Sequence, residues 1–217
     1  MKHDENAHFS AGELSSMVAK IVRRAGSDRG EEALMVADAN DGYDFEFATD
    51  ELTTLIPSNL RITRVNRGRM EPEKAKNCLL EAIYRKQFLV NYVGHGSVDQ
   101  WRGNLLTNEE ALGLRNDYLP MFVMMTCLNG LFNDPALDSL GESFLKAEGG
   151  GIVVWASSGM TLPHEQALMN QELYRLLFNG STAMTIGEAV MRAKTGSINA
   201  DARRTWILLG DPSMKLR

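Results

Sequence analysis

The chain has 217 residues, a formal net charge of −5 and a hydrophobic fraction of 44%. This composition is that of a folded globular protein, and its acidic balance argues against a nucleic-acid partner, which would need a basic face. No apolar run reaches the roughly 18 residues that a membrane-spanning helix needs, and two cysteines, Cys78 and Cys127, are too few for a disulfide framework.

The first segment combines a polar leader with an amphipathic helix. Residues 1–7 are polar and contain no apolar core of an export signal. A helix is predicted over residues 10–24, because Ser10 can cap it and apolar residues recur on one face. We expect residues 1–30 to be a leader and connecting helix, and residues 31–217 to form one domain.

Strand and helix signals alternate through the rest of the chain. Short apolar runs predict strands at residues 32–37, 60–65, 87–93, 121–125, 152–156 and 205–209. Helices are predicted from Thr49 or Asp50 to residue 57, at 72–86, briefly after Thr107, and at 138–148, 163–178 and 185–197. The alternation predicts an α/β fold with a mostly parallel central sheet and helices on both faces.

Two short motifs directly follow predicted strands. They are residues 91–97 (NYVGHGS) and residues 125–130 (MTCLNG). Ligands of parallel sheets bind beyond the carboxyl ends of the strands, so His95 and Cys127 are predicted to face one crevice. A thiol beside an imidazole is suited to nucleophilic catalysis. From the residues alone, a structural histidine and a buried, inert cysteine are equally good interpretations.

The catalytic interpretation also needs groups that stabilise charge. An unperturbed cysteine titrates near ~8.5, so its thiolate needs support from a neighbouring imidazole, which can also protonate the departing amine. Negative charge on the attacked carbonyl oxygen would be stabilised by backbone amides at tight turns. The amides of Gly96 and Cys127 are the candidates, and Gly96 can approach closely because it has no side chain.

Several sequence blocks, in family order from about residue 31 to 217, resemble the gingipain family of cysteine peptidases, whose core is caspase-like. They are residues 35–42 (MVADANDG), residues 91–97 with Trp101, Leu119 and Pro120 leading into 126–132 (TCLNGLF), 151–158 (GIVVWASS) and 205–213 (TWILLGDPS). The resemblance implies a three-layer caspase-like fold and a cysteine endopeptidase. It implies Cys127 as the nucleophile, His95 as the general acid and base, and an oxyanion site at the amides of Gly96 and Cys127.

The resemblance implies further site residues on the neighbouring loops. An acid that orients the histidine is expected after the first strand, where Asp38 and Asp41 are candidates and solvated loop carboxylates are an equally good interpretation. The implied substrate pocket has as candidates Asp44, Glu46, Met125, Ser157 and Ser158. A carboxylate at Asp44 or Glu46 would give a weak preference for cleavage after basic residues.

The expected chemistry requires no cofactor and no catalytic metal, although the acidic loop equally suits a structural calcium ion. The expected partners are protein or peptide substrates, with no nucleic acid and no membrane span. By resemblance, a smaller α/β subdomain precedes this region in the full protein, which acts outside the cell or at its surface.

Two other functions are weighed against the peptidase. The alternative is a catalytically silent caspase-like module for interaction or assembly, which a screen of peptide libraries for cleavage would distinguish. A nucleotide-binding protein is disfavoured, because the sequence contains no Gly-x-Gly-x-x-Gly or Gly-Lys-Ser/Thr phosphate loop.

Overall fold

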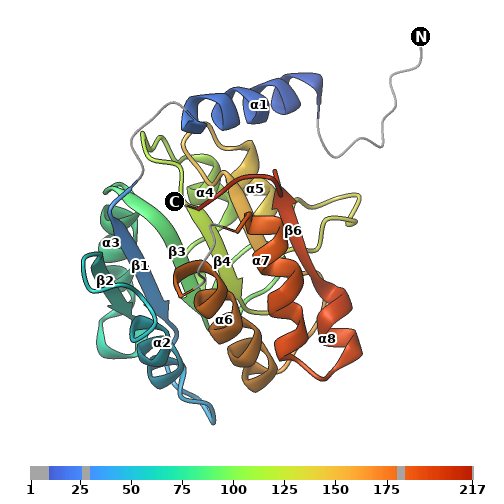
Figure 1. The fold of residues 1–217 in the computed structure, drawn as a ribbon. Helices are drawn as coiled ribbons and strands as arrows, with labels where there is room; N and C mark the ends of the chain where they lie inside the picture. The colour runs from blue at the N-terminus through green and yellow to red at the C-terminus, as the bar shows by residue number, and fades with distance from the viewer. Residues whose placement is uncertain (1–9, 26–29, 180–183, 217) are drawn as a thin grey trace.

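We describe a computed structural model of the chain that places residues 10–25, 30–179 and 184–216. In this part, six strands form one sheet in the order β2-β1-β3-β4-β5-β6. Neighbouring strands are parallel, except that β6 is antiparallel to β5 (Figure 1). The strands are β1 (Glu32–Ala37), β2 (Arg61–Asn66), β3 (Gln87–Val93), β4 (Met121–Met125), β5 (Val153–Ser157) and β6 (Trp206–Gly210).

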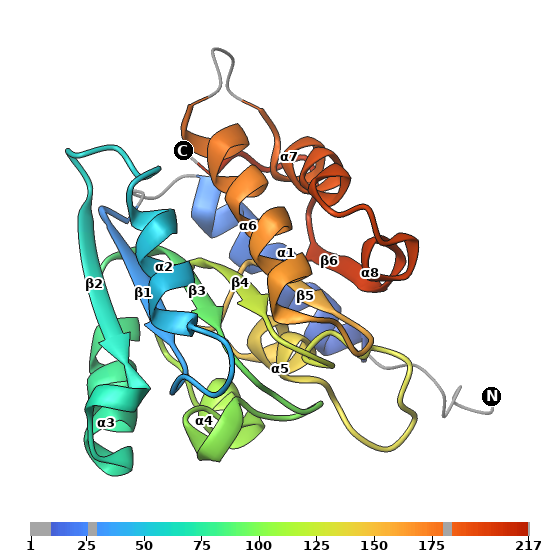
Figure 2. The same ribbon diagram turned by 90° about the horizontal axis from the view of Figure 1, so that it is seen from below.

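Helices cover both faces of the sheet (Figure 2), which confirms the predicted α/β architecture. One face is covered by α2 (Phe45–Thr53), α6 (Pro163–Phe178) and α7 (Ile186–Ala193). The other is covered by α3 (Pro72–Ile83), α4 (Asn108–Leu112) and α5 (Leu140–Lys146). The remaining helical segments are α1 (Ala11–Ala25), α8 (Ala200–Thr205), and the 3₁₀ turns η1 (Arg67–Arg69), η2 (Arg102–Asn104) and η3 (Lys194–Gly196).

The sheet has an apolar core on each side because strand side chains alternate between its faces. In β1, Ala33, Met35 and Ala37 belong to the core under α2 and α6, whereas Leu34 and Val36 belong to the core under α3 and α5. A strand buried on both sides is a continuous apolar run, which is why the sequence identified β1, β3, β4 and β5 well.

Two helical segments differ from the prediction. Helix α2 begins at Phe45, not at Thr49 or Asp50, because the side chain of Asp44 caps it by accepting a hydrogen bond from the amide of Phe47. Helix α8 was not predicted, although Asn199 caps it in the same way. Short helices fixed by their caps give little periodic signal. The predicted leader at residues 1–7 lies outside the described residues.

A buried lysine fixes α1 to the domain. Lys20 is 4% exposed, and its Nζ donates hydrogen bonds to the carbonyl oxygens of Ala147 at 2.7 Å, Gly151 at 3.2 Å, Leu145 and Phe144. These carbonyls lie at and beyond the C-terminal end of α5, where the helix dipole favours a cation. Burial lowers the pKa of Lys20 to about 8, so the side chain is charged at neutral pH.

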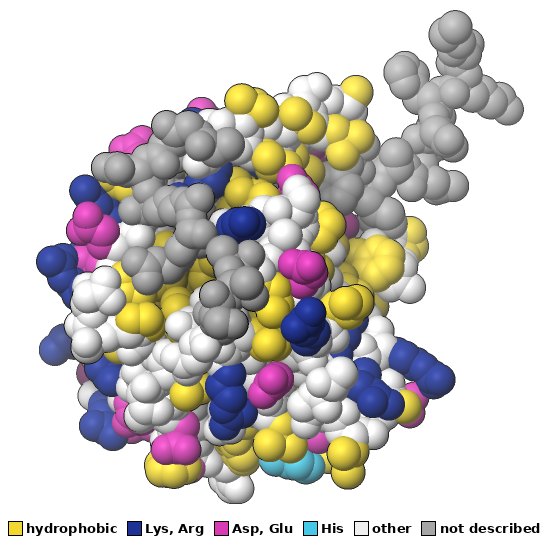
Figure 3. Space-filling view, viewed as in Figure 1, with side chains coloured by type: hydrophobic (Ala, Val, Ile, Leu, Met, Phe, Trp, Pro, Cys, Tyr) yellow, Lys and Arg dark blue, Asp and Glu magenta, His cyan; other side chains and the backbone are white. Residues whose placement is uncertain are grey.

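The opposite face of α1 carries apolar side chains that are exposed in the described structure. Leu14, Val18 and Val22 recur at helical spacing, and Figure 3 shows hydrophobic side chains along this helix. Met17 and Ile21, by contrast, pack toward the core. Among the described helices, none combines the length and apolar character needed to cross a membrane.

We expect Lys20→Met to lower the free energy of unfolding by about 2 kcal/mol at neutral pH, because several carbonyl groups lose a charged donor. Urea denaturation measures this change. Arg23→Met is the matched control, since Arg23 lies on the same helix and makes an exposed hydrogen bond to the carbonyl of Glu148. The control should change stability by less than about 0.5 kcal/mol. Equal losses in the two variants would contradict the anchoring role.

Candidate active site

The register of the sheet brings two loops to the same level at its carboxyl edge. Val93 at the end of β3 pairs with Met125 at the end of β4. His95 and Cys127 each follow their paired residue by two positions, and adjacent strands are only about 4.8 Å apart. The predicted juxtaposition of the histidine and cysteine loops therefore follows from the strand register.

Two glycines allow the loops to approach this closely. A Cβ atom added to Gly96 would lie 2.7 Å from Oγ1 of Thr126, at the end of the neighbouring strand. A Cβ atom added to Gly94 would overlap the side chains of Asp38 and Tyr92. Any larger residue at either position would therefore push the histidine loop away from its neighbours.

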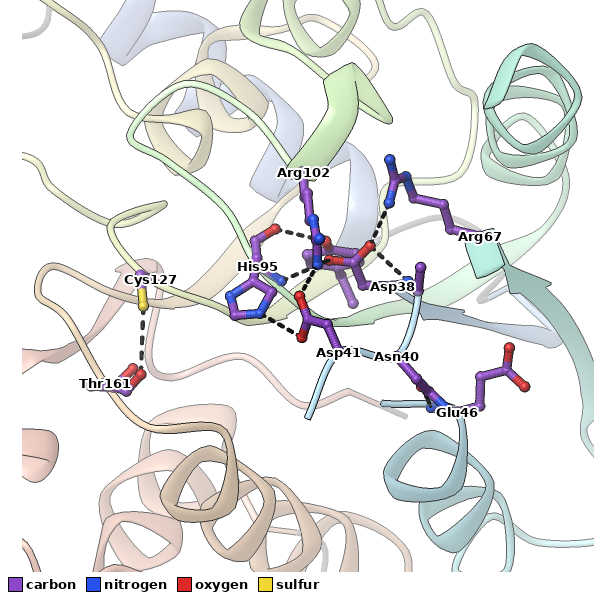
Figure 4. Close-up of polar contacts among 11 residues, drawn as sticks. Asp38, Asn40, Asp41, Glu46, Arg67, His95, Arg102, Cys127 and Thr161 are labelled. Atoms are coloured by element: carbon purple, nitrogen blue, oxygen red, sulfur yellow. Dashed lines mark hydrogen bonds and ion pairs between the residues drawn. The ribbon is translucent and has the colours of Figure 1, made fainter. Parts of the chain in front are cut away.

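The imidazole of His95 lies against a carboxylate on one side and a phenyl ring on another. Its Nε2 is 3.1 Å from Oδ1 of Asp41, and its ring packs edge-on against Phe45 with centroids 5.2 Å apart. A ring nitrogen that faces a carboxylate holds its proton there, which leaves Nδ1 to exchange a proton with another group. In Figure 4, Nδ1 points away from Asp41 and toward the side that carries Cys127.

The two candidate acids occupy different places. Asp41 contacts the imidazole, whereas Asp38 is fully buried beneath the loop and accepts a hydrogen bond from the backbone amide of His95 at 3.1 Å. Asp38 also pairs with Arg67 at 3.0 Å. Arg102 pairs closely with Asp41 and lies 3.8 Å from Asp38. The structure thus brings Asp41 to the histidine ring and Asp38 to its backbone.

The pKa of the Asp41 carboxyl is lowered from its ordinary value of 3.8. Loss of hydration is the largest single influence and acts to raise this pKa. The hydrogen bonds and charges of His95 and Arg102 together outweigh it. Asp41 is therefore ionised at neutral pH and can stabilise a positive charge on the imidazole.

Cys127 lies in a strained turn. Its half-buried thiol donates a hydrogen bond to the carbonyl oxygen of Thr161, 3.5 Å away (Figure 4). The next residue, Leu128, has a φ of 63°, a left-handed conformation that costs a non-glycine residue roughly 1–2 kcal/mol. The turn is held by a hydrogen bond from the Leu128 amide to the carbonyl of Gly159 at 3.3 Å. Such strain is common at functional sites.

Two backbone amides at the site are available as donors. Within the described residues, neither the amide of Gly96 nor that of Cys127 donates a hydrogen bond to another backbone or side-chain group. Gly96 faces Trp101 across an isolated antiparallel bridge, which keeps the loop in place. Free amides at such turns suit an anionic oxygen.

The two predicted pocket carboxylates are engaged within the protein. Asp44 accepts a hydrogen bond from the amide of Phe47 at 2.9 Å, as the cap of α2. Glu46 pairs closely with Arg69 of η1. The Glu46 side chain is 12% exposed and that of Arg69 is 68% exposed.

The other predicted pocket residues mostly lie below the surface. Met125 and Ser157 are fully buried, and the hydroxyl of Ser158 donates to the carbonyl of Thr205 at 2.9 Å. Their contact with a substrate stays a prediction. No group of three or more His, Cys, Asp and Glu side chains in the described residues is arranged to hold a metal ion. A structural calcium ion also stays a prediction.

Two residues of this site were not predicted from the sequence. Arg67 lies in a short run rich in arginine, and Arg102 follows the histidine motif, and neither is marked by a distinguishing pattern. A buried carboxylate such as Asp38 needs a nearby cation, which was not predicted from the sequence. The sequence could not indicate which arginine would provide it.

Asp41→Asn should be less stable than the wild type at neutral pH, and the difference should shrink as the pH falls below 3.8. A carboxyl with a lowered pKa contributes stability that is complete above the unfolded value and lost as the pH falls through the folded value. Urea midpoints measured across this range test the expectation. The exposed pair of Asp201 with Arg204 supplies the control, since Asp201→Asn should change the midpoints little. A constant difference for Asp41→Asn would argue against the pairing.

Comparison with solved structures supports the fold. The complex of Porphyromonas gingivalis RgpB pro- and mature domains has a TM-score of 0.81 and 19% identity, and the match covers 94% of this chain and 54% of that chain. The Arg specific cysteine proteinase gingipain R (RGPB) has a TM-score of 0.82 and 20% identity, with 100% and 57% covered. This chain thus spans little more than half the length of these structures.

Comparison with sequences gives two results. No curated protein sequence matches this chain. The model of peptidase family C25, in contrast, matches residues 9–217, which is nearly the whole chain. The sequence motifs that resemble gingipains, the mostly parallel sheet and this match agree. The chain belongs to peptidase family C25, the gingipain family.

Proposed function

We propose that the chain carries the active site of a cysteine endopeptidase, with Cys127 as the nucleophile and His95 as the general acid and base. One observation carries this proposal. The paired ends of β3 and β4 present the histidine and cysteine loops at the same level, and the imidazole already contacts a carboxylate. A base held by a third group beside a nucleophile is the general pattern of covalent catalysis.

The reaction follows from the groups present. The Cys127 thiol passes its proton to Nδ1 of His95 as the sulfur attacks the peptide carbonyl carbon and forms a C–S bond, and the amides of Gly96 and Cys127 stabilise the resulting oxyanion. The C–N bond then breaks, and His95 gives a proton from Nδ1 to the departing amine. Water hydrolyses the thioester with His95 as the base, which releases the carboxylic acid and restores the thiol. Asp41 stabilises the imidazole in the steps in which it is charged.

A peptide inhibitor with a thiol-reactive group should label Cys127, and the protein should cleave a peptide library. Cys127→Ala should abolish both activities, and His95→Ala should lower the cleavage rate by roughly 10²–10⁴-fold because the general acid and base is lost. Mass spectrometry locates the label, and Cys78→Ser controls for the second cysteine. Cleavage that survives Cys127→Ala would rule out this nucleophile.

We further propose that Glu46 provides the weak preference for basic residues before the scissile bond. Its partner Arg69 is exposed and contacts Glu46 from η1, so a substrate guanidinium or ammonium could take its place. Asp44 is less suited, because its carboxylate is fixed as the cap of α2. The acidic charge would then select substrates by electrostatic complementarity.

Glu46→Gln should lower kcat/KM for peptides with arginine or lysine before the cleaved bond by about tenfold and leave peptides with alanine or leucine unchanged. This factor corresponds to about 1.4 kcal/mol for a charged contact. Glu51→Gln removes the same charge from the same helix and is the matched control. If both substrate classes responded equally to Glu46→Gln, Glu46 would have no part in specificity.

We also propose that the full protein contains a further subdomain, N-terminal to α1. We propose that this full protein acts outside the cell or at its surface. The solved relatives are nearly twice as long as the matched region, and one of them is described as a complex of pro- and mature domains. The exposed apolar residues Leu14, Val18 and Val22 of α1 offer such a subdomain a packing surface.

The alternative function, a catalytically silent interaction module, is favoured by one observation. In this structure the Cys127 thiol donates its hydrogen bond to the carbonyl of Thr161, and no hydrogen bond joins it to His95. The labelling experiment decides between the two functions. A folded protein that contains the upstream region, yet neither reacts at Cys127 nor cleaves peptides, would favour the module.

A further inference from the structure

Arg102 contacts two carboxylates at once. Its guanidinium pairs closely with Asp41 and lies 3.8 Å from Asp38, while its backbone amide donates to the carbonyl of His95 at 2.9 Å. Figure 4 shows the guanidinium between the two aspartates. Because a guanidinium is planar and carries several N–H donors in fixed directions, it can hold two acceptors in a defined relative position.

The Asp38 end of this arrangement is fixed. Asp38 is fully buried, and its Oδ1 accepts hydrogen bonds from Arg67 at 3.0 Å and from the amide of Ala39 at 2.7 Å. Its Oδ2 accepts from the amide of His95 at 3.1 Å. Moving this carboxylate would leave a buried charge without partners, which is strongly unfavourable.

The Asp41 end is not fixed by its own surroundings. Asp41 lies in a bend outside any helix or strand, and its side chain is 37% exposed. The two oxygens of its carboxylate contact different partners: Oδ1 faces Nε2 of His95, and Oδ2 faces Arg102. An exposed carboxylate with a single partner contributes little and rotates readily in water. The second contact, to Arg102, therefore sets which way the carboxylate faces.

We propose that Arg102 is a positioning residue, which holds the Asp41 carboxylate against the imidazole of His95 by linking it to the buried carboxylate of Asp38. The role in turnover rests on the proposed peptidase function. Within the described residues, the Arg102 side chain has no hydrogen bond or ion pair with His95 or Cys127, so it acts through Asp41. The pKa of Arg102 is raised, chiefly by its bond to Asp41, which agrees with a fully ionised pair.

Arg67 provides the control that separates positioning from general support. Like Arg102, it forms an ion pair with Asp38. Substitution by Gln at either position therefore removes one positively charged partner of the Asp38 carboxylate. Among the described contacts, only Arg102 also reaches Asp41. A purely structural role would make Arg67→Gln and Arg102→Gln alike, whereas a positioning role distinguishes them.

The first test is a double-mutant cycle on kcat and KM for a peptide substrate. Arg102→Gln should lower kcat by about tenfold with little change in KM, and should have almost no effect in the Asp41→Asn background. Arg67→Gln should change kcat by the same factor in the wild-type and Asp41→Asn backgrounds, whatever that factor is. An Arg102→Gln effect of equal size in both backgrounds would overturn the proposal.

The second test needs no catalysis and so separates this inference from the proposed function. In the Cys127→Ala protein, NMR signals of the His95 ring are compared among variants, and His95→Ala identifies them among the four histidines. Arg102→Gln should move these signals in the same direction as Asp41→Asn, and Arg67→Gln should move them less, because Arg67 has no contact with Asp41 among the described residues. If this pattern appears and the protein with Cys127 intact cleaves no peptide, the peptidase proposal fails and the positioning role stands. Arg102→Gln signals like those of the wild type would overturn it.

A conservative variant keeps the test decisive if Arg102→Gln folds poorly. Arg102→Lys keeps the positive charge, but an ammonium is a point charge that lacks the planar fork needed to orient two carboxylates. It should keep the thermal midpoint near the wild type while shifting the His95 signals part of the way toward those of Asp41→Asn. An Arg102→Lys protein with wild-type ring signals and wild-type kcat would show that charge alone suffices, which contradicts positioning by geometry.

Discussion

The site depends on one buried charge, the carboxylate of Asp38. It directly follows β1, accepts a hydrogen bond from the His95 amide, and pairs with Arg67 and Arg102. A charge withdrawn from water is costly unless it is paired and hydrogen-bonded, so these partners cannot leave it without a large penalty. Asp38 therefore holds together the end of β1, the turn η1 and the loop after β3. These contacts fix the position of the loop that carries the His95 imidazole.

The sheet and the loops position the residues of the site in different ways. The apolar core on both sides of the sheet fixes the strand register, and the register sets the heights of the His95 and Cys127 loops. Polar contacts then fix the orientation of the side chains within those loops. The strained turn at Leu128 directly follows the buried strand β4, and hydrogen bonds from the amides of Leu128 and Gly130 hold it against the end of β5. The favourable free energy of core packing therefore offsets the cost of the left-handed conformation of Leu128 at the site.

Much of the fold could be predicted because buried strands and amphipathic helices leave periodic patterns in the sequence. That the His95 and Cys127 loops follow adjacent parallel strands could also be predicted, from the apolar runs before them. The choice between Asp38 and Asp41 could not be made, because both lie on one loop and differ only in tertiary contacts. Arg102 was missed for the same reason. Cys78, the other cysteine, is half-buried and packs against the core under α3.

The antiparallel direction of β6 also decides where the described chain ends. This strand starts at the edge of the sheet that carries the His95 and Cys127 loops and runs back to the opposite edge, close to α1 (Figure 1). Both ends of the described polypeptide therefore lie on the side of the molecule opposite the His95 and Cys127 loops. A purification tag or a reporter joined at either end of the described polypeptide would start on that side, away from the His95 and Cys127 loops.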